Sequence, residues 1–293
     1  MIFVVGGGFG VYGHLAALAA SGREVGAPSR YRQMVEQRPE LRHVSGEVSW
    51  RDDEAQGLAS ATTVVLARRP ADNAALALEL CATEEPPALV IEKPIAPSAS
   101  ASIALAEQLD AGGCAWSTPY LFQYCDWYEH LASSLSGNGS ATLTWRFRQG
   151  AAPSAWKSQP REGGGALAFY FIHCIALAEA ALPGATMTFS RVEADGRQQI
   201  SLVASRGEAR LSIDFHLADE PVHFLLETDS GARFEAETPF GARPMAGAPD
   251  PRIAPLRRFY DDVVFGGRAP GAQFHARVHE HWRRLETIAG RHD

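Results

Sequence analysis

The sequence has no apolar run long enough to cross a bilayer and no excess of basic residues. A membrane-spanning helix needs about 18 or more consecutive apolar residues. The net charge of −7 argues against binding a nucleic-acid backbone by bulk electrostatics. The first residues, MIFVVGGGFG, lack a basic segment and a small-residue cleavage site, so no signal peptide is expected. These absences predict a protein with no nucleic acid and no membrane as partner, and we expect it to be cytoplasmic.

Cysteine is scarce and is not arranged to bind a metal or to form a disulfide framework. The four cysteines lack CxxC spacing and are interpreted as reduced thiols. In the segment QFHARVHEHW, His275 and His279 are four residues apart, but no HExxH order accompanies them. We therefore expect no metal site, and we expect these histidines to be solvated on the polar face of an amphipathic helix.

The first glycine-rich segment follows an apolar run directly. Residues 2–5, IFVV, are typical of a buried parallel strand, and an Ala/Leu-rich helix follows the glycines. Gly8, Gly10 and Gly13 have the G-x-G-x-x-G spacing, with Phe9 between the first two. In this context Gly8 permits a tight turn, Gly10 lets backbone approach a pyrophosphate, and Gly13 allows close packing of helix on strand. The segment predicts dinucleotide binding.

The next strand end lacks the acidic residue that would hold the adenosine ribose hydroxyls. After Val25 the chain continues with Ala27, Pro28, Ser29 and Arg30. Ser29 and Arg30 suit a 2′-phosphate, which favours NADP(H), with NAD(H) also possible. The alternative is that these residues belong to a solvated loop.

Two further strand ends are expected at the same edge of a parallel sheet. TTVVLA, residues 62–67, is followed by Arg68, and PALVIE, residues 87–92, is followed by Lys93. We count Ala67 and Arg68 among the cofactor-binding residues, and contact with the substrate or with water alone is the alternative for the arginine. Ligands of open α/β sheets bind at such carboxyl ends. A lysine there can hydrogen-bond a substrate oxygen and transfer its proton, whereas the alternative is a surface lysine.

The glycine fingerprint, the EKP motif at Lys93 and the later GGGALAFYFIH segment occur in an order that resembles the glucose–fructose oxidoreductase and inositol dehydrogenase family (Gfo/Idh/MocA). The resemblance covers nearly the whole chain. It implies an α/β N-terminal Rossmann dinucleotide-binding domain, followed by an α+β domain with a large, mostly antiparallel open sheet. It also implies that Lys93 and His173 lie at the nicotinamide and the substrate, and we count Glu92 among the cofactor-binding residues.

The GGGALAFYFIH segment departs from the family pattern at one position. The family has an aspartate where this chain has Phe169, while the glycines and His173 are kept. On an α-helix Phe169 and His173 share a face, because they are four residues apart. The resemblance favours a catalytic role for His173. The alternative is that His173 is a buried core residue with its hydrogen bonds made inside the protein.

The second half of the chain reads as a sheet of alternating strands, such as ATLTWRF at 141–147. We predict a dinucleotide-binding domain at 1–118 and a substrate-binding and oligomerisation domain at 119–293. An uncovered sheet face would expose an apolar patch. We therefore predict a homodimer or homotetramer joined through this sheet.

Candidate substrate residues in the second half are Tyr120, Trp156, Lys157 and Phe169. Core packing is an equal alternative for Tyr120, and a solvated loop is one for Trp156 and Lys157. The function predicted is an NADP(H)-dependent oxidoreductase of a carbohydrate-type carbonyl or hydroxyl, with nucleotide-linked or acidic sugars as candidate substrates. The alternatives are a non-catalytic NAD(P)-binding regulator and an imine reductase of secondary metabolism.

Overall fold

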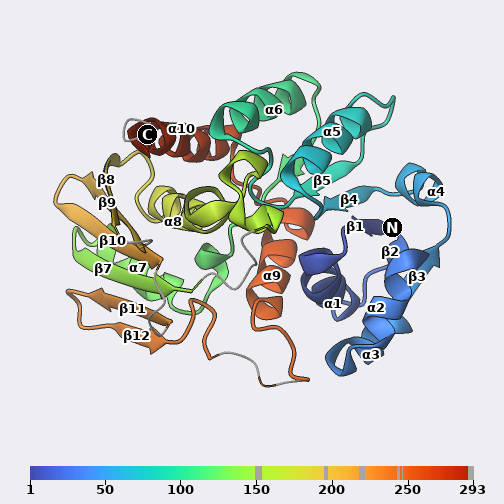
Figure 1. The fold of residues 1–293 in the computed structure, drawn as a ribbon, viewed down its shortest axis with the longest axis horizontal. Helices are drawn as coiled ribbons and strands as arrows, with labels where there is room; N and C mark the ends of the chain where they lie inside the picture. Colours follow the sequence, from blue (N-terminus) through green and yellow to red (C-terminus); the bar gives the residue numbers. More distant parts are fainter. Residues whose placement is uncertain (149–153, 195–196, 218–221, 243–244, 246, 290–293) are drawn as a thin grey trace. The chain divides into compact units, whose positions relative to one another are not determined.

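The computed structural model describes residues 1–148, 154–194, 197–217, 222–242, 245 and 247–289 (Figure 1). The chain divides into two compact units, each of which is built from separate segments. Unit 1 comprises Met1–Ala96, Ala104–Pro119 and Pro244–Pro270. Unit 2 comprises Pro97–Ile103, Tyr120–Arg243 and Gly271–Asp293. The change of unit at Pro119 lies beside the predicted limit of 118, but a late segment of the chain also packs with unit 1. That residues 1–118 fold as a domain of their own stays a prediction.

Unit 1 is built on a six-stranded parallel sheet with strand order β3-β2-β1-β4-β5-β6. Its strands are β1 (Ile2–Val5), β2 (Val25–Pro28), β3 (Val48–Arg51), β4 (Thr63–Leu66), β5 (Ala88–Ile91) and β6 (Trp116–Ser117). Every residue of β1 and β4 is buried, as the continuous apolar runs predict for strands covered on both faces. The strand order reverses between β1 and β4, the place where such sheets bind ligands. The predicted Rossmann-type fold is confirmed.

The helices of unit 1 follow the strands in alternation, apart from two late ones. The early elements are η1 (Gly10–Leu15, a π-helix), α1 (Ala16–Ala19), η2 (Ser29–Tyr31), α2 (Arg32–Glu36), η3 (Pro39–Leu41), α3 (Arg42–Ser45), α4 (Glu54–Ala59), α5 (Pro70–Cys81) and α6 (Ala99–Ala111), whose first turn belongs to unit 2. The late ones are α9 (Ile253–Phe259) and the π-helix η8 (Tyr260–Phe265). Because α9 packs against α1 and η1, residues far apart in sequence meet beside the glycine turn.

Unit 2 contains a second six-stranded sheet with order β12-β11-β7-β10-β9-β8. Its strands are β7 (Ser140–Phe147), β8 (Thr186–Ala194), β9 (Arg197–Arg206), β10 (Ala209–Leu217), β11 (His223–Thr228) and β12 (Arg233–Ala236). The pair β7–β10 is parallel and the other pairs are antiparallel. The mostly antiparallel sheet predicted from the alternating strands is therefore confirmed.

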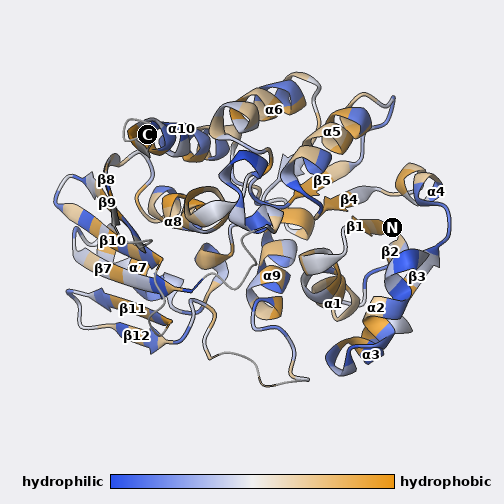
Figure 2. Ribbon diagram, in the orientation of Figure 1, coloured by the Kyte–Doolittle hydropathy of each residue, from blue (hydrophilic) through white to orange (hydrophobic). Residues whose placement is uncertain are grey.

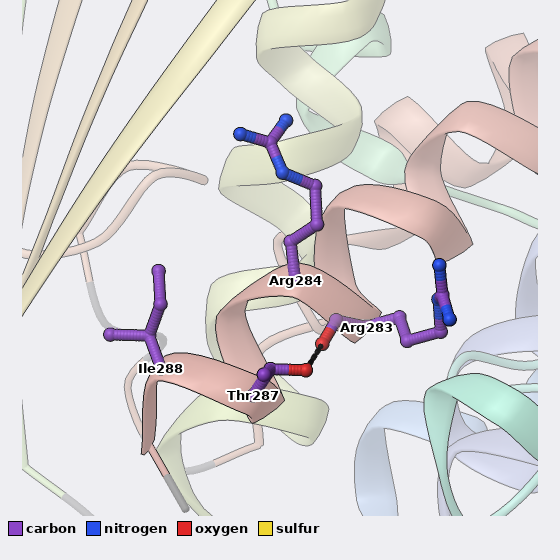
Figure 3. A pocket seen from close by; sticks show the side chains of 4 residues that line it. All are labelled: Arg283, Arg284, Thr287 and Ile288. Atoms are coloured by element: carbon purple, nitrogen blue, oxygen red, sulfur yellow. Dashed lines mark hydrogen bonds between the residues drawn. The ribbon is translucent and has the colours of Figure 1, made fainter. Parts of the chain in front are cut away.

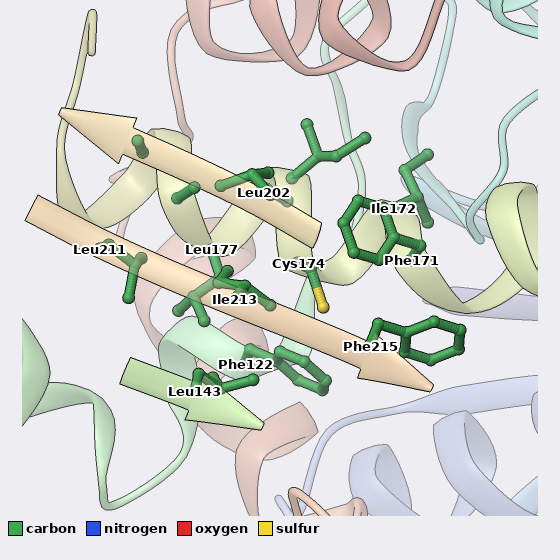
Figure 4. Packing of buried hydrophobic residues seen from close by; sticks show 14 of the residues in the cluster. Phe122, Leu143, Phe171, Ile172, Cys174, Leu177, Leu202, Leu211, Ile213 and Phe215 are labelled. Carbon is green, nitrogen blue, oxygen red and sulfur yellow. The ribbon is translucent and has the colours of Figure 1, made fainter. Parts of the chain in front are cut away.

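One face of this sheet is covered by helices. The helical segments of unit 2 are η4 (Leu121–Tyr124), α7 (Tyr128–Ser136), η5 (Trp156–Ser158), η6 (Pro160–Glu162), the π-helix η7 (Ala166–Phe171), α8 (Ile172–Ala181) and α10 (Ala272–Ala289). Helix α8 is apolar on nearly all sides and buried from Ile172 to Glu179, as expected of a helix inside a core. Figure 4 shows Cys174 and Leu177 of α8 facing the apolar side chains of β10, among them Ile213.

The other face of the sheet is mostly polar. Residues that alternate with the buried ones include Thr142 on β7, Asp214 on β10 and Thr188 and Ser190 on β8, and Figure 2 shows polar and apolar residues alternating along these strands. Among the described residues, the large hydrophobic side chains that are exposed are Met34, Val192 and Met245. The expectation of a large exposed apolar face is therefore wrong, because each strand buries its apolar side chains toward α8 and directs hydroxyls and charges outward.

Helix α10 buries a wider stripe than the sequence indicates. Val278 and Trp282 are in the core, as predicted, but His275 and His279 are only 1% and 0% exposed. The expectation that these histidines are solvated is wrong, because they stand one turn from the apolar residues of the same face. In the described part of the chain, no group of three or more His, Cys, Asp or Glu residues could hold a metal. None of the helices described there is long and apolar enough to span a membrane.

Candidate active site

The turn after β1 brings backbone from two strands into close contact. Gly6 has φ +145°, and a Cβ on it would lie 2.2 Å from the carbonyl oxygen of Ala67. A Cβ on Gly10 would lie 3.2 Å from the Ala67 Cβ and 3.7 Å from Val4. Gly8 is exposed, and a Cβ there would meet nothing within 4 Å. The glycines thus differ: two are needed by the fold, and one leaves open space at the surface.

This arrangement corrects the roles predicted for the glycines. The tight turn belongs to Gly6 instead of Gly8, and the close packing of helix on strand belongs to Gly10 instead of Gly13. A Cβ on Gly13 would lie 2.3 Å from the ring of Phe9, so Gly13 makes room for an aromatic ring of its own helix. The exposed Gly8 backbone is what a pyrophosphate needs in order to approach, so the turn fits a dinucleotide.

The residues after β2 and β4 meet through a carboxylate that the sequence did not single out. Ser29 is half-buried, and Arg30 donates a hydrogen bond to Glu54 and another, 3.2 Å long, to the hydroxyl of Tyr31. Arg68 donates a hydrogen bond to the same Glu54. The two arginines predicted to bind cofactor therefore share one counter-ion.

The backbone at the end of β4 is fixed by a buried side chain. Asn73 is 1% exposed, and its Oδ1 accepts a hydrogen bond of 2.9 Å from the amide of Arg68. The Ala67 amide donates to the Val5 carbonyl at 2.8 Å, which continues the sheet to the edge. The position of Arg68 beside the glycine turn is thus set by the fold.

The EKP segment leaves the same edge of the sheet two strands from the glycine turn. The amide of Glu92 donates to the Leu66 carbonyl at 2.9 Å, so Glu92 still belongs to the β4–β5 ladder and Lys93 is the first residue beyond it. Lys93 is half-buried, and its peptide bond to Pro94 is cis.

Glu92 is held by a buried histidine of η1. His14 is 0% exposed; its Nε2 lies 3.0 Å from Glu92 Oε1 and its Nδ1 lies 2.5 Å from the hydroxyl of Tyr260 in η8. Burial, and next the nearby charge of Glu92, raises the pKa of Tyr260 well above its ordinary value. Phe9 packs edge-on against His14. The guanidinium carbon of Arg252 lies 4.4 Å from the centroid of the Phe9 ring. The chain thus connects the glycine turn to the EKP motif by direct contact.

In unit 2, the three glycines of the GGG segment are required by local geometry. Gly163 and Gly165 have φ +80° and +79°, and a Cβ on Gly164 would lie 2.1 Å from the Trp156 carbonyl oxygen. Positive φ strongly favours glycine. These residues therefore pack the η5 turn, which carries Trp156 and Lys157, against the start of η7.

The predicted substrate residues near this turn do come together. The ring of Trp156 packs edge-on against Phe169 with centroids 5.4 Å apart, and Phe169 packs on Tyr170 at 4.9 Å. The Lys157 ammonium lies 5.5 Å from the Phe169 ring centroid and 5.9 Å from that of Trp156. All four side chains are partly exposed. They form an aromatic surface with one positive charge.

His173 has different neighbours from Phe169. It is 7% exposed and stacks on Phe122 with ring centroids 4.9 Å apart. Tyr120, 1% exposed, lies edge-on to His173 at 6.4 Å, and its hydroxyl is 3.5 Å from His279 Nε2. The position of Tyr120 in the core favours core packing over substrate contact. Lys93 belongs to unit 1 and His173 to unit 2.

Lysine is rare among the basic residues of this chain. Of the 27 Lys and Arg residues, two are lysines, Lys93 and Lys157. Both occur in the segments predicted for the site. Arginine serves the rest of the chain, and arginine cannot release its proton near neutral pH. The scarcity is a sequence signal that would have singled out both residues without any family resemblance.

A shallow hollow on α10 holds none of the predicted site residues. It has a volume of about 260 Å³ and is lined by Arg283, Arg284, Thr287 and Ile288. Figure 3 shows the Thr287 hydroxyl bonded to the Arg283 carbonyl of the preceding turn. We assign it no part in the site.

No family model and no curated protein matches the sequence. Solved structures do match the fold. A myo-inositol dehydrogenase from Corynebacterium glutamicum is similar with 12% identity over 98% of this chain and 95% of that chain, at a TM-score of 0.69. A Gfo/Idh/MocA family oxidoreductase from Vibrio cholerae is similar with 14% identity over 96% of this chain and 94% of that one, also at 0.69. The chain has the Gfo/Idh/MocA fold.

A third similar structure was solved with ligands. It is the WlbA dehydrogenase from Thermus thermophilus in complex with NAD and UDP-GlcNAcA, with 14% identity over 97% of this chain and 93% of that one, and a TM-score of 0.68. At such identities the likeness establishes the fold alone. The family resemblance drawn from the motifs is thereby matched by structural neighbours along nearly the whole length.

Proposed function

We propose that the protein is an NADP(H)-dependent oxidoreductase that transfers hydride to or from a carbohydrate-type carbonyl or hydroxyl. The observation that carries this proposal is the meeting of two motifs at one sheet edge. His14, which follows the glycine turn, hydrogen-bonds Glu92, which precedes Lys93. The ends of three neighbouring strands, β1, β4 and β5, carry the exposed glycine turn, the loop at Ala67 and Arg68, and Lys93.

Residues of unit 1 would hold the dinucleotide. The exposed backbone at Gly8, with Phe9 and Gly10 behind it, would face the pyrophosphate, and Ala67 and Arg68 would lie along it. Ser29 and Arg30 would contact a 2′-phosphate, which is why we propose NADP(H) before NAD(H). When bound, the nicotinamide supplies or accepts the hydride.

Lys93 would act on the substrate oxygen. A half-buried ammonium group next to the cofactor site can donate a hydrogen bond to a carbonyl oxygen and give up its proton as the alkoxide forms. We propose His173, in unit 2, as a second hydrogen-bond partner of the substrate. Phe169 cannot hold a charge, so Lys93 would carry most of the proton transfer.

The aromatic surface of unit 2 supports a sugar as the substrate. Aromatic rings such as Trp156 and Phe169 offer apolar faces against which the C–H groups of a sugar ring can pack. The Lys157 ammonium would pair with a carboxylate or phosphate on that sugar. Nucleotide-linked or acidic sugars are accordingly the substrate class that we propose.

We also propose a homodimer or homotetramer joined through the open sheet of unit 2. Since the outward face is polar, such an interface would rely on hydroxyls and charges, with bridging water, instead of apolar burial. A single species at the monomer mass in light scattering at micromolar concentration would contradict this.

The proposed function is tested by titrating the protein with NADPH and NADH, followed by a panel of keto-sugars, sugar alcohols and imines. NADPH should bind several-fold tighter than NADH, and Arg30→Ala should weaken NADPH selectively. Arg283→Ala, on α10 of unit 2, is the matched control and should change neither affinity. An equal loss of affinity for NADPH and NADH in Arg30→Ala would refute the proposed role of Arg30 in NADP(H) preference.

The absence of an acidic residue at Phe169 favours one alternative, a regulator that binds NAD(P) without catalysis. That alternative gains if the wild-type protein binds NADPH but reduces no keto-sugar and no imine. Turnover of any substrate in the panel excludes it.

A further inference from the structure

Glu54 accepts hydrogen bonds from two guanidinium groups at the carboxyl edge of the unit 1 sheet. Its Oε2 is bonded to Arg30 and its Oε1 to Arg68. The three residues follow three different strands: Arg30 follows β2, Glu54 follows β3 and Arg68 follows β4. We call this arrangement the Arg30–Glu54–Arg68 clasp.

The clasp spans more of the sheet than its sequence positions suggest. The strand order is β3-β2-β1-β4, so the contact between Glu54 and Arg68 passes across the ends of β2 and β1. The glycine turn leaves the sheet at the end of β1, and the adenosine half of a dinucleotide lies between the glycine turn and the end of β2 in this topology. The clasp therefore closes over the region that the adenosine would enter.

The charges of the clasp do not cancel. Two guanidinium groups and one carboxylate leave one positive charge. The side chains are 52%, 22% and 27% exposed for Arg30, Glu54 and Arg68, so an anion from solvent can reach them. Carboxylates and phosphates accept the same paired hydrogen bonds from arginine. Glu54 thus occupies the arginine donors that a phosphate would use.

We propose that Glu54 sets the discrimination between NADP(H) and NAD(H) by acting as the internal counter-ion of Arg30 and Arg68. The inference rests on the proposed function, in which unit 1 binds a dinucleotide. A 2′-phosphate must share or take over the arginines that Glu54 holds, and it does so against the repulsion of the carboxylate. A plain 2′-hydroxyl meets neither demand. Glu54 consequently limits the NADP(H) preference that Arg30 provides.

A purely structural Glu54 predicts a different pattern. If Glu54 only anchored α4, its loss would change the affinities for both cofactors by the same factor. If Glu54 mainly held the arginines in place for a phosphate, its loss would weaken NADP(H) more than NAD(H). The ratio of the two affinities, not either affinity alone, separates these roles.

The test uses Glu54→Gln, which keeps the length of the side chain and one acceptor oxygen but removes the charge. Glu36→Gln is the matched control, because Glu36 pairs with Arg32 at 2.8 Å within α2 and bridges no strands. Both variants and the wild type are titrated with NADPH, NADH, 2′,5′-ADP and 5′-ADP. The last two probes report the adenosine half without the nicotinamide.

We expect Glu54→Gln to tighten NADPH and 2′,5′-ADP by about 5- to 20-fold, the size of one removed charge at partly screened contact distance. NADH and 5′-ADP should change by less than about two-fold, and the gain should shrink as salt screens the charges. Glu36→Gln should leave the ratio of NADPH to NADH affinity unchanged.

An unchanged ratio in Glu54→Gln, or a selective loss of NADPH, overturns the inference while leaving dinucleotide binding intact. Failure of the wild-type protein to bind any of the four probes overturns the proposed function and this inference with it. The two failures are therefore distinguishable in one set of titrations.

Discussion

His14 Nε2 lies 3.0 Å from Glu92 Oε1, so the helix that follows the glycine turn touches the residue that precedes Lys93. The other ring nitrogen of His14 is bonded to Tyr260 at 2.5 Å. A buried ring with both nitrogens engaged cannot turn without breaking a hydrogen bond in a place that water does not reach. The backbone that carries Lys93 is thereby tied to η1 and to η8, which come from opposite ends of the chain.

Tyr260→Phe is expected to destabilise the protein by about 1–2 kcal/mol, because it leaves a buried nitrogen of His14 without its hydrogen bond. The ring itself is retained, so packing in unit 1 should be kept. Urea denaturation measures the change in unfolding free energy. Tyr128→Phe, at a half-buried ring in unit 2, is the control and should cost less. A Tyr260→Phe midpoint equal to that of the wild type would show that the bond contributes nothing to stability.

Gly8→Ala should separate cofactor binding from folding. A Cβ there meets no protein atom within 4 Å, so the unfolding free energy should stay within about 0.5 kcal/mol of wild type. The added methyl group should reduce NADPH affinity by about ten-fold or more, because it stands where the pyrophosphate must approach the backbone.

Two other alanine variants frame the result. Gly46→Ala also meets nothing within 4 Å, but it lies at the end of α3 and should leave affinity unchanged. Gly6→Ala should unfold the protein or destabilise it severely, because its Cβ would overlap the Ala67 carbonyl. Full NADPH affinity in Gly8→Ala would rule out the proposed pyrophosphate position.

The strands that could be predicted are those with a single clear pattern. The continuous apolar runs of β1, β4 and β5 and the alternating residues of β7 each show one pattern over a few positions. The strand β3 (VSWR) has no such pattern, because only its first residue is buried. The role of each glycine could not be predicted, because GGGFGVYG contains more than one G-x-G register. The contact between Gly6 and Ala67 in the folded chain decides between these registers.

Site residues that depend on contacts between distant segments could not be predicted. His14 and Glu92 are 78 positions apart, and Arg30 and Glu54 are 24 apart. The order of strands decides such meetings, and no local pattern carries that order. The exposure of His275 and His279 was predicted wrongly for a related reason. A histidine on an amphipathic helix is expected on the polar face unless the width of the buried stripe is known.

The protein should become less stable as the pH is lowered, because of His275 and His279. Burial, with a smaller contribution from His279, lowers the pKa of His275 from 6.5 to about 3, and burial lowers that of His279 to about 4. Between pH 6.5 and these values the unfolded chain binds protons that the folded chain does not, so the unfolding free energy decreases as the pH falls. At pH 5 the loss should be about 2 kcal/mol for each histidine.

Urea denaturation between pH 4.5 and pH 8 measures this dependence. His279→Leu should flatten the slope by about one proton, at most about 1.4 kcal/mol per pH unit. His43→Gln is the control, because it also removes one histidine, but at an exposed position. A slope that His279→Leu leaves unchanged would mean that His279 is already accessible to protons in the folded protein.

Substitution of Lys93 by arginine tests whether Lys93 transfers a proton. Lys93→Ala removes charge and proton together, whereas Lys93→Arg keeps the charge and the hydrogen-bond donors but holds its proton near neutral pH. If Lys93 transfers the proton, both variants should lose about 10²–10⁴ in kcat. NADPH affinity should stay within a few fold, and His173→Ala should cost less than either.

The second lysine provides the contrast that makes this reading specific. Lys157 is proposed to pair with an anionic group of the substrate, a task that a guanidinium performs as well. Lys157→Arg should therefore keep kcat and change KM little, while Lys157→Ala should raise KM. If Lys93→Arg instead kept most of the rate, Lys93 would be a charge that stabilises the developing alkoxide, and the proton would have to come from another group, with His173 the first to test. A chain that uses arginine almost everywhere keeps lysine at two positions, and this pair of substitutions asks at which of them the releasable proton is the reason.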